Sequence, residues 1–356
     1  MQVGERNFST LWLEKKKVKI IDQRKLPFEL VVKELKTLQQ FCFAIKEMQV
    51  RGAPLIGVTA AFGFATAIQE DSSDSNIERS YKALFNTRPT AINLKWALDL
   101  IKNKLKKVKK SEKAFKSFEL AKIIRDNDII NCQKIALNGY KIIHDIFKKK
   151  KRRINILTHC NAGWLATIDW GTALAPIFLA NRNKIPIHVW VDETRPRNQG
   201  ALLTAWELKN ENVPYTIIVD NAGGHLMQNK KVDLCIVGSD RTTKDGHVCN
   251  KIGTYLKALC AFDNNIPFYV ALPSSTIDCN ISLSKVPIEE RSGKELSHLL
   301  FQKNGKIFNG NIYFKDSKTF NPAFDITPSK YITKLITENG VFTPKRSEIK
   351  KCILNG

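Results

Sequence analysis

The segment Ile154-Asn155-Ile156-Leu157-Thr158-His159-Cys160 decides the fold. A short run of isoleucine and leucine ends abruptly at a histidine and a cysteine, which is typical of a buried strand that stops at the edge of a sheet. Similar apolar runs follow at Ile187–Val191, Tyr215–Val219, Leu234–Val237 and Phe268–Leu272. Helical patterns lie between them at Trp170–Ala180, Gly200–Asn210 and Lys251–Asp263. This alternation predicts a Rossmann-like, doubly wound parallel sheet with helices on both faces.

Most of the predicted strands stop at, or within a few residues of, a polar or reactive side chain. In an open α/β sheet, ligands bind beyond the carboxyl ends of the strands, so these side chains are expected to gather at one edge. They are Cys160, Asp192, Asp220, Asp240 and Ser275. For any single aspartate the alternative stays open that it only caps the next helix. Taken together, the set predicts a functional edge.

The chain before this alternation has a mainly helical pattern, in which apolar residues recur at helical spacing. The expected elements are a strand at Val18–Asp22 and helical segments at Phe28–Met48, Leu55–Gln69 and Ala91–Phe147. The basic run Lys148–Arg153 marks the change of pattern. We therefore expect an α/β protein. A smaller, mainly helical N-terminal domain with a small sheet would comprise residues 1–148, and a Rossmann-like catalytic domain residues 149–356.

Composition excludes several classes of function. The 356 residues carry a formal net charge of +23. The basic runs are mostly lysine without interleaved aromatic residues, so we expect a solvated surface and no nucleic-acid partner. No apolar run is long enough to span a membrane, and no signal peptide is recognisable. The eight scattered cysteines fit a reducing compartment, so a cytoplasmic protein is expected.

The sequence indicates no cofactor and no metal. The segment Thr158–Gly163 after the first strand of the alternation lacks the G-x-G-x-x-G pattern of dinucleotide-binding loops. No Walker A loop, no H-E-x-x-H motif and no C-x-x-C pair is present. The usual signatures of nicotinamide-dependent hydride transfer, phosphoryl transfer and zinc hydrolysis are therefore missing.

Three basic positions are candidates for binding an anion. Arg51-Gly52-Ala53-Pro54 opens an apolar helix, whose first backbone N–H groups favour phosphate, and Gly52 would let the backbone approach closely. Arg88 stands beside a turn, and Asn250-Lys251 is expected to begin the helix after Asp240. For both arginines, an exposed side chain in an ordinary loop remains the alternative.

Eight segments, taken in order along the chain, resemble those of the methylthioribose-1-phosphate isomerase family. They are Val50–Gly57, Ile156–Asn161, Val191–Pro196, Val237–Arg241, Asn250–Tyr255, Pro273–Asp278, Ile288–Arg291 and Asn321–Asp325. The resemblance runs from about Asp22 to Gly340. The wider superfamily also holds ribose-1,5-bisphosphate isomerases and regulatory subunits of a translation-initiation guanine-exchange factor. The His-Cys-Asn, Gly-Ser-Asp-Arg and Asn-Lys segments resemble the catalytic branch.

The resemblance implies a reaction and a set of site residues. The reaction is isomerisation of 5-methylthioribose 1-phosphate to 5-methylthioribulose 1-phosphate in methionine salvage, by a homodimer. The implied catalytic residues are Cys160 and Asp240, and the implied substrate-binding residues are Arg51, Gly52, Ala53, Arg88, Gln199, Asn250 and Lys251. An isomerase of another 5-substituted or 5-deoxy ribose 1-phosphate, and a non-catalytic regulatory protein of the same fold, remain alternatives.

The expected chemistry is acid–base catalysis. A phosphate on C1 blocks spontaneous ring opening, so Asp240 would protonate the ring oxygen while Cys160 acts as base, or stabilises the transition state, at C2. Proton transfer and hydride transfer both remain open. The bulky Trp164 and Trp170 depart from the family pattern, and they either reshape the substrate pocket or pack within the fold.

Overall fold

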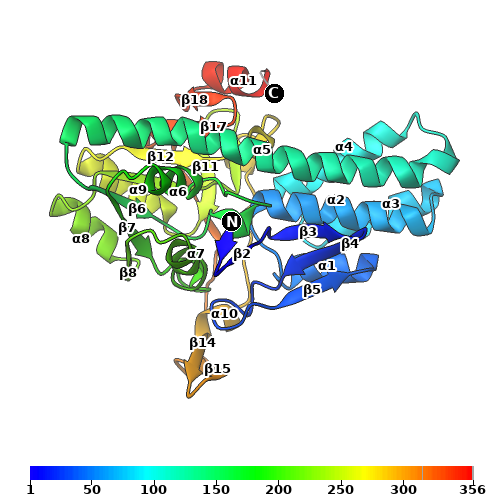
Figure 1. The fold of residues 1–356 in the computed structure, drawn as a ribbon, viewed down its shortest axis with the longest axis horizontal. Coiled ribbons are helices and arrows are strands. Elements are labelled where there is room, and N and C mark those ends of the chain that lie inside the picture. Colours follow the sequence, from blue (N-terminus) through cyan, green and yellow to red (C-terminus); the bar gives the residue numbers. More distant parts are fainter. Residues whose placement is uncertain (315, 355–356) are drawn as a thin grey trace.

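The computed structural model describes residues 1–314 and 316–354, and it shows an α/β architecture with a helical N-terminal part beside a large sheet (Figure 1). The large sheet contains β6 (Ile154–Thr158), β7 (Ile187–Asp192), β8 (Tyr215–Ile218), β9 (Leu234–Val237), β12 (Phe268–Ala271), β17 (Lys334–Thr337) and β18 (Gly340–Phe342). Their spatial order is β18-β17-β12-β9-β6-β7-β8. All neighbours are parallel except β17 and β18. All five predicted strands of the alternation are confirmed.

The strand order fixes where ligands can bind. Numbered along the chain, the six parallel strands run 3-2-1-4-5-6 across the sheet, the order of a doubly wound α/β fold. The first strand, β6, therefore lies between β7 and β9. The chain adds β7 and β8 on one side of β6 and then crosses over to add β9 and β12 on its other side. This reversal is the switch point at which such sheets open a crevice.

Helices cover both faces of this sheet. They are α6 (Ala175–Arg182), α7 (Ala205–Asn210), α8 (Ala222–Gln228), α9 (Thr254–Asp263) and α11 (Arg346–Leu354). On one face, Ile177 and Phe178 of α6 pack with Leu208 of α7 over the inward side chains of β6 and β7. On the other face, α8, α9 and α11 form a separate apolar core. Burial on both faces explains why the strands lack polar alternation.

The N-terminal part is a helical layer on a small antiparallel sheet. The sheet consists of β3 (Leu11–Glu14), β4 (Lys17–Ile21) and β5 (Val32–Leu35), and the helices are α1 (Leu38–Lys46), α2 (Ala53–Glu70), α3 (Asp74–Phe85) and α4 (Ile92–Leu105). Helix α2 is apolar almost all round and is buried along nearly its whole length, as its composition predicts.

One predicted helix, Phe28–Met48, is wrong in its first half. Residues Val32–Leu35 form strand β5, which pairs with β4. The helix begins only at Leu38, where a capping box joins Thr37 and Gln40. The apolar residues before the cap fit a helical period, but pairing with β4 decides their conformation.

Helix α5 (Lys110–Lys150) joins the two parts of the molecule, and it extends along the upper side of Figure 1. Leu120, Ala121 and Ile124 contribute to the N-terminal core. Ile135 and Ile143, further along, contribute to the core beneath the large sheet. The division into residues 1–148 and 149–356 stays a prediction, because this helix supplies side chains to both cores.

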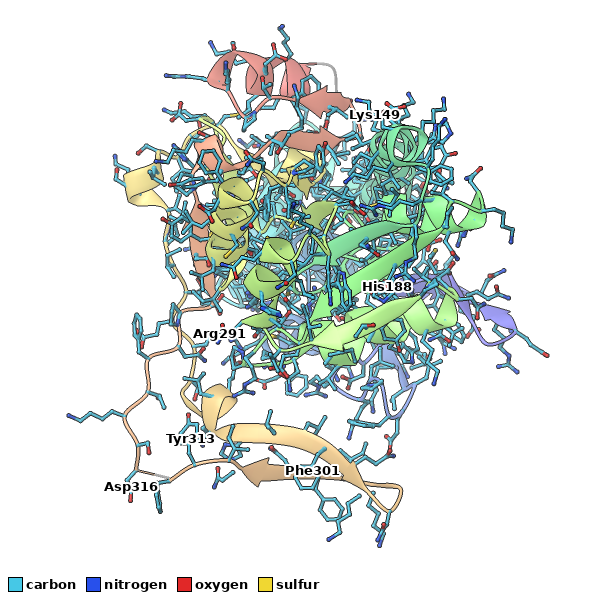
Figure 2. The ribbon with its side chains drawn as sticks, turned by 90° about the vertical axis from the view of Figure 1, so that its left-hand side faces the viewer. Lys149, His188, Arg291, Phe301, Tyr313 and Asp316 are labelled. Carbon is cyan, nitrogen blue, oxygen red and sulfur yellow. The ribbon has the colours of Figure 1, made fainter. Side chains whose placement is uncertain are left out.

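Additional strands lie outside the predicted alternation. A four-stranded sheet has the order β13-β10-β11-β16, with β10 (Arg241–Thr243), β11 (Val248–Lys251), β13 (Ile277–Asp278) and β16 (Phe324–Thr327). Beyond α10 (Lys294–Ser297), the strands β14 (His298–Lys303) and β15 (Lys306–Asn311) form a hairpin that projects from the body, with Phe301 on it (Figure 2). A short hairpin of β1 (Gln2–Val3) and β2 (Arg6–Asn7) begins the chain. Among the described residues, no helix is both long and apolar enough to cross a bilayer.

A buried carboxyl on α5 makes stability depend on pH. Asp128 accepts a hydrogen bond from the backbone N–H of Ile168 at 2.7 Å. Burial, with smaller contributions from Asp169 and Glu338, raises the pKa of Asp128 to about 7. The unfolded chain loses this proton near pH 4, so between about pH 4 and 7 the folded state binds more protons. Folding stability from this group is therefore complete at low pH and is lost as pH rises through this window.

We expect Asp128→Asn to remove this dependence. The amide keeps an acceptor for Ile168 but carries no charge, so the variant should gain stability relative to the wild type as pH rises from 4 to 8. At roughly 1.4 kcal/mol per pKa unit, the gain is at most about 4 kcal/mol. Thermal unfolding at several pH values measures it. Asp126→Asn, on the same helix but exposed, is the control and should show no such trend. A pH-independent difference between Asp128→Asn and wild type would contradict the expectation.

Candidate active site

The switch point places a thiol next to a carboxyl group. Cys160 lies two residues beyond β6, and Asp240 lies three residues beyond β9, so both follow the carboxyl ends of hydrogen-bonded neighbours. Neighbouring strands are about 4.8 Å apart, so the two loops leave the sheet side by side. Both residues line one cavity of about 60 Å³.

All nine residues predicted for the site line this cavity. They are Arg51, Gly52, Ala53, Arg88, Cys160, Gln199, Asp240, Asn250 and Lys251. Their roles in catalysis and binding remain predictions, but the fold brings them together from the N-terminal helices, the large sheet and the four-stranded sheet. Two cavity atoms, Gln199 Oε1 and Arg88 Nε, are buried without a hydrogen-bond partner among the described residues. Unpaired buried polar atoms are costly, so they favour a polar ligand here.

The backbone at Cys160 is held in an uncommon conformation. Its φ angle is +64°, in the left-handed region that residues other than glycine rarely adopt. Its N–H donates to Thr194 Oγ1 at 2.8 Å, and its carbonyl accepts from Thr204 Oγ1 at 2.7 Å. Thr204 ends a π-helical turn, Gly200–Thr204, which precedes α7. Such strained positions are typical of functional sites.

Three cationic side chains surround the cavity. Arg51 donates from both terminal nitrogens to Asn161, at 2.5 Å to Oδ1 and 2.6 Å to the carbonyl oxygen. Arg88 pairs with Glu289 at 2.9 Å. Lys251 donates to the carbonyl oxygen of Ala323 at 3.0 Å. A cavity with this much positive charge is suited to a phosphate.

Burial and these cations act in opposite directions on the two reactive groups. Burial raises the pKa of the Cys160 thiol, while Arg51 and Lys251 lower it. Burial likewise raises the pKa of Asp240, against the lowering effect of Lys251, Arg88 and Arg51. Asp240 therefore holds its proton to higher pH than an exposed aspartate, which suits a general acid.

The structure corrects the predicted position of Asn250 and Lys251. They end strand β11 of the four-stranded sheet and do not begin the next helix, because α9 starts only at Thr254 after the N-cap Gly253. The strand aims Lys251 into the cavity, where its ammonium also lies 4.9 Å from the centre of the Phe324 ring. The unfavourable placement of a lysine in the first turn of a helix therefore does not arise.

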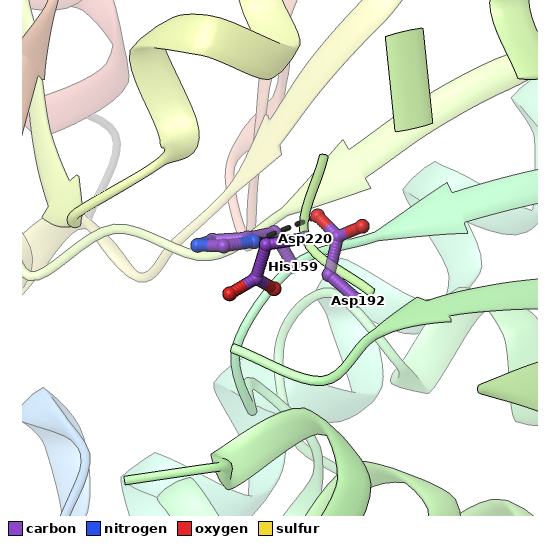
Figure 3. Close-up of side chains that lie close together, drawn as sticks. All are labelled: His159, Asp192 and Asp220. Atoms are coloured by element: carbon purple, nitrogen blue, oxygen red, sulfur yellow. Dashed lines mark hydrogen bonds and ion pairs between the residues drawn. The ribbon is translucent and has the colours of Figure 1, made fainter. Parts of the chain in front are cut away.

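Asp192, Asp220 and Ser275 do not line the cavity, although all three lie at the predicted edge of the sheet. Asp192 is fully buried and lies 2.8 Å from His159 Nδ1, with Asp220 close by (Figure 3). Asp220 accepts from the backbone N–H groups of Thr194 and Arg195, both at 2.7 Å. Ser275 accepts a hydrogen bond from Asn93 of α4 at 3.0 Å. All three positions support the loops around the cavity.

The group His159, Asp192 and Asp220 has the spacing of a metal site, but its hydrogen bonds indicate a structural role. The second ring nitrogen of His159 lies 2.8 Å from the carbonyl oxygen of Ile252. The Lys257 ammonium, 3.2 Å from Asp192 Oδ2, already supplies a positive charge. The group ties the ends of β6 and β7 to the loop before α9.

The two tryptophans that depart from the family pattern, Trp164 and Trp170, pack against other side chains of the protein. Trp164 is fully buried, with its ring 5.8 Å from that of Trp206. The guanidinium of Arg182 lies over the Trp170 ring at 4.8 Å. Neither lines the cavity. The residues that sequence reasoning missed are instead Asn161, Thr194, Glu207 and Glu289. Asn161 and Glu289 lie in segments that resemble the family, whereas nothing in the sequence marks Glu207.

Comparison with known proteins places this geometry in a family. Residues 49–344 match the Initiation factor 2 subunit family. Methylthioribose-1-phosphate isomerase from Rhizobium meliloti (strain 1021) is 53% identical over 357 residues, covering 98% of each chain. The same-named protein of Escherichia coli O45:K1 (strain S88 / ExPEC) is 53% identical, covering 98% of this chain and 95% of its own.

Solved structures agree in fold. The crystal structure of 5-methylthioribose 1-phosphate isomerase from Pyrococcus horikoshii OT3 has a TM-score of 0.84 and 36% identity, and the match covers 99% of this chain and 97% of that one. The structure named translation initiation factor eIF-2B, subunit delta, from A. fulgidus has a TM-score of 0.79 and 35% identity, with 98% and 100% covered.

The fold and these comparisons place the chain among the α/β isomerases related to the Initiation factor 2 subunit family. Within that class, the chain belongs to the methylthioribose-1-phosphate isomerase family.

A substitution at Gly52 tests how closely the N-terminus of α2 approaches the segment after β6. Its φ is +96°, and a Cβ there would lie 2.5 Å from the carbonyl oxygen of Ala166. Gly52→Ala should lower kcat/KM for isomerisation at least ~10-fold, because small displacements at a site are costly, and it should lower Tm. Gly305→Ala is the control, since Gly305 also has a positive φ, of +76°, but faces open space. Equal activity in the two variants would show that the contact is unimportant.

Proposed function

We propose that the chain converts 5-methylthioribose 1-phosphate to 5-methylthioribulose 1-phosphate, as a cytoplasmic step of methionine salvage. The observation that carries this proposal is the shared cavity, in which Cys160 and Asp240 meet three cations. The named relatives support the choice of substrate.

In the proposed mechanism, the cations Arg51, Arg88 and Lys251 hold the phosphate and Gln199 binds a sugar hydroxyl. Asp240 gives its proton to the ring oxygen as the bond from that oxygen to C1 breaks. Cys160, as thiolate, takes the proton from C2 to give an enol between C1 and C2. It then returns a proton to C1, while the C2 hydroxyl gives its proton to the Asp240 carboxylate and becomes a carbonyl. Burial keeps the acid protonated, as its step requires. Burial also raises the pKa of the Cys160 thiol, and Arg51 and Lys251 offset only part of this increase, so the thiolate is the minor form that the base step draws on.

A second cavity, next to the first, offers space for a substituent at C5. It measures about 410 Å³ and shares Met48, Arg51 and Gln199 with the cavity at Cys160. Its lining includes Leu202 and Leu203 of the segment before α7. A sugar phosphate held at its phosphate end would extend towards this partly apolar space. The width of the space leaves other 5-substituted and 5-deoxy ribose 1-phosphates as candidate substrates.

The catalytic assignment predicts that Cys160→Ser and Asp240→Asn each lower kcat by about 10²–10⁴, with smaller effects on KM. A panel of 5-substituted ribose 1-phosphates, assayed for ketose formation, measures this and ranks the substituents. Cys279→Ser and Asp245→Asn replace an exposed thiol and a loop carboxylate outside the cavity and serve as controls. Reaction in D₂O places solvent deuterium at C1 if Cys160 transfers a proton, whereas a direct hydride shift does not.

Two outcomes contradict the proposal. Wild-type turnover by both variants would show that the catalytic pair is wrongly assigned. No turnover of any aldose 1-phosphate by the wild type would instead favour a non-catalytic binding protein, as the name of the A. fulgidus relative suggests for that protein.

We further propose that the chain is a homodimer. Ile217 and Val219 are exposed at and just beyond the edge strand β8, and Leu256 is exposed on α9. Lys257 of α9 donates to the carbonyl oxygen of Asp220, which links α9 to the loop after β8. These exposed apolar side chains are our candidates for the surface that a second copy covers.

Sedimentation equilibrium should therefore give twice the mass of one chain. Val219→Asp combined with Leu256→Asp should shift the protein to monomer, because it places two charges where the second copy would bury them. Phe115→Asp, at an exposed position on α5 away from this surface, is the control. A wild-type monomer, or a dimer unaffected by the paired substitution, would contradict this surface.

A further inference from the structure

A buried carboxyl on α7 lies behind the cavity and has no part in the chemistry above. Glu207 is fully buried, and it does not line the cavity that contains Cys160 and Asp240. Burying a charged group is expensive unless it is fully hydrogen-bonded or paired. Its partners therefore show what it does.

Every partner of Glu207 is a donor. Its Oε1 accepts from the side-chain amide of Asn161 at 2.8 Å and from the backbone N–H of Leu165 at 3.2 Å. Its Oε2 accepts from the backbone N–H of Trp164 at 2.8 Å. An ionised carboxylate, which only accepts, fits this set better than a protonated one. Burial opposes ionisation and raises the pKa of Glu207 to about 7, while these bonds and Arg51 lower it.

Asn161 connects this carboxylate to the phosphate-binding cation. An amide donates from one end and accepts at the other. Its Nδ2 is engaged by Glu207 and, at 3.1 Å, by Thr204 Oγ1, so its Oδ1 must point the other way. There it accepts from Arg51 at 2.5 Å. A reversed amide would set an NH₂ group against the guanidinium.

The charges along this chain of contacts are complementary. Arg51 is buried, and burial lowers its pKa, while Cys160, Asp240 and Glu207 raise it. Cys160 and Asp240 take part in the reaction, so their charges change during turnover. Glu207 faces Arg51 through Asn161 and has no proposed role in proton transfer, so the reaction itself does not change its charge. Networks of this kind orient their members when every hydrogen bond is satisfied.

We propose that Glu207 is a positioning residue: acting through the Asn161 amide, it orients the Arg51 guanidinium to receive the substrate phosphate. This inference rests on the proposed function, in which Arg51 holds that phosphate. It predicts that Glu207 governs phosphate affinity more than the rate of the chemical step.

The first test is Glu207→Gln, which keeps the size of the side chain. Glutamine has one acceptor oxygen where three donors converge, so the Asn161 amide loses its fixed orientation. KM for the sugar phosphate, and Kd for inorganic phosphate measured by calorimetry, should rise ~10–100-fold, the range expected for a misplaced binding group. The value of kcat should change much less. Glu211→Gln is the matched control, because Glu211 lies just after α7, is also largely buried, and pairs with Arg182 instead.

The decisive test relocates the charge. Asn161→Asp alone sets a carboxylate against Glu207 and should also weaken phosphate binding. In the double variant Asn161→Asp, Glu207→Gln, the new carboxylate contacts Arg51 directly and accepts from the glutamine amide, so most of the affinity should return. Such a cycle reports the coupling between the two sites, which a general packing defect would not restore.

Thermal unfolding checks that each variant is folded. If Glu207→Gln alone does not fold, the double variant decides the question. Phosphate affinity of Glu207→Gln equal to that of Glu211→Gln would overturn the proposal. So would a loss that the double variant does not recover. If the wild type isomerises none of the sugar phosphates, the proposed function fails, whereas the Kd for inorganic phosphate still tests Glu207. A wild type that binds no phosphate overturns the inference itself.

Discussion

The pairing of β6 with β9 is the constraint on which the rest of the site depends. Because β6 is flanked by strands reached in opposite directions along the chain, the loops that follow β6 and β9 diverge above the sheet and leave a crevice. Cys160 and Asp240 come from these two loops, far apart in sequence, yet adjacent strands hold them together. The N-terminus of α2 closes the crevice from the other side with Arg51, Gly52 and Ala53.

Hydrogen bonding explains how three cations remain in a confined space. The cations at the cavity each have an acceptor at 3.0 Å or less: Asn161 for Arg51, Glu289 for Arg88 and the Ala323 carbonyl for Lys251. A bound phosphate would add charge of the opposite sign at the point where they converge. Behind this layer, His159 and Asp192 fix the loops so that the thiol and the acid keep their places. Substrate binding therefore completes an electrostatic arrangement that the fold has already oriented.

Much of the large sheet could be predicted from sequence, because strands buried on both faces are apolar throughout and end at polar residues. The bounds of β6 and β9 were predicted to the residue. The start of α1 and the position of Lys251 were not, since they depend on strand pairing, of β5 with β4 and of β11 with the distant β16. Asp192 and Asp220 were expected at the right edge, but whether a strand-end carboxylate faces a cavity or a neighbouring loop depends on tertiary contacts. Glu207 gave no signal, because an isolated glutamate in a helix is ordinary until its burial is known.

Helix α5 passes from one apolar core to the other without a break. Loss of either core would therefore strip one half of this helix of its packing, and the other half would lose helical continuity with it. The two parts of the molecule are thus joined by packing on one continuous helix, although they have separate cores. A single unbroken secondary-structure element here takes the place of a flexible linker between the two parts.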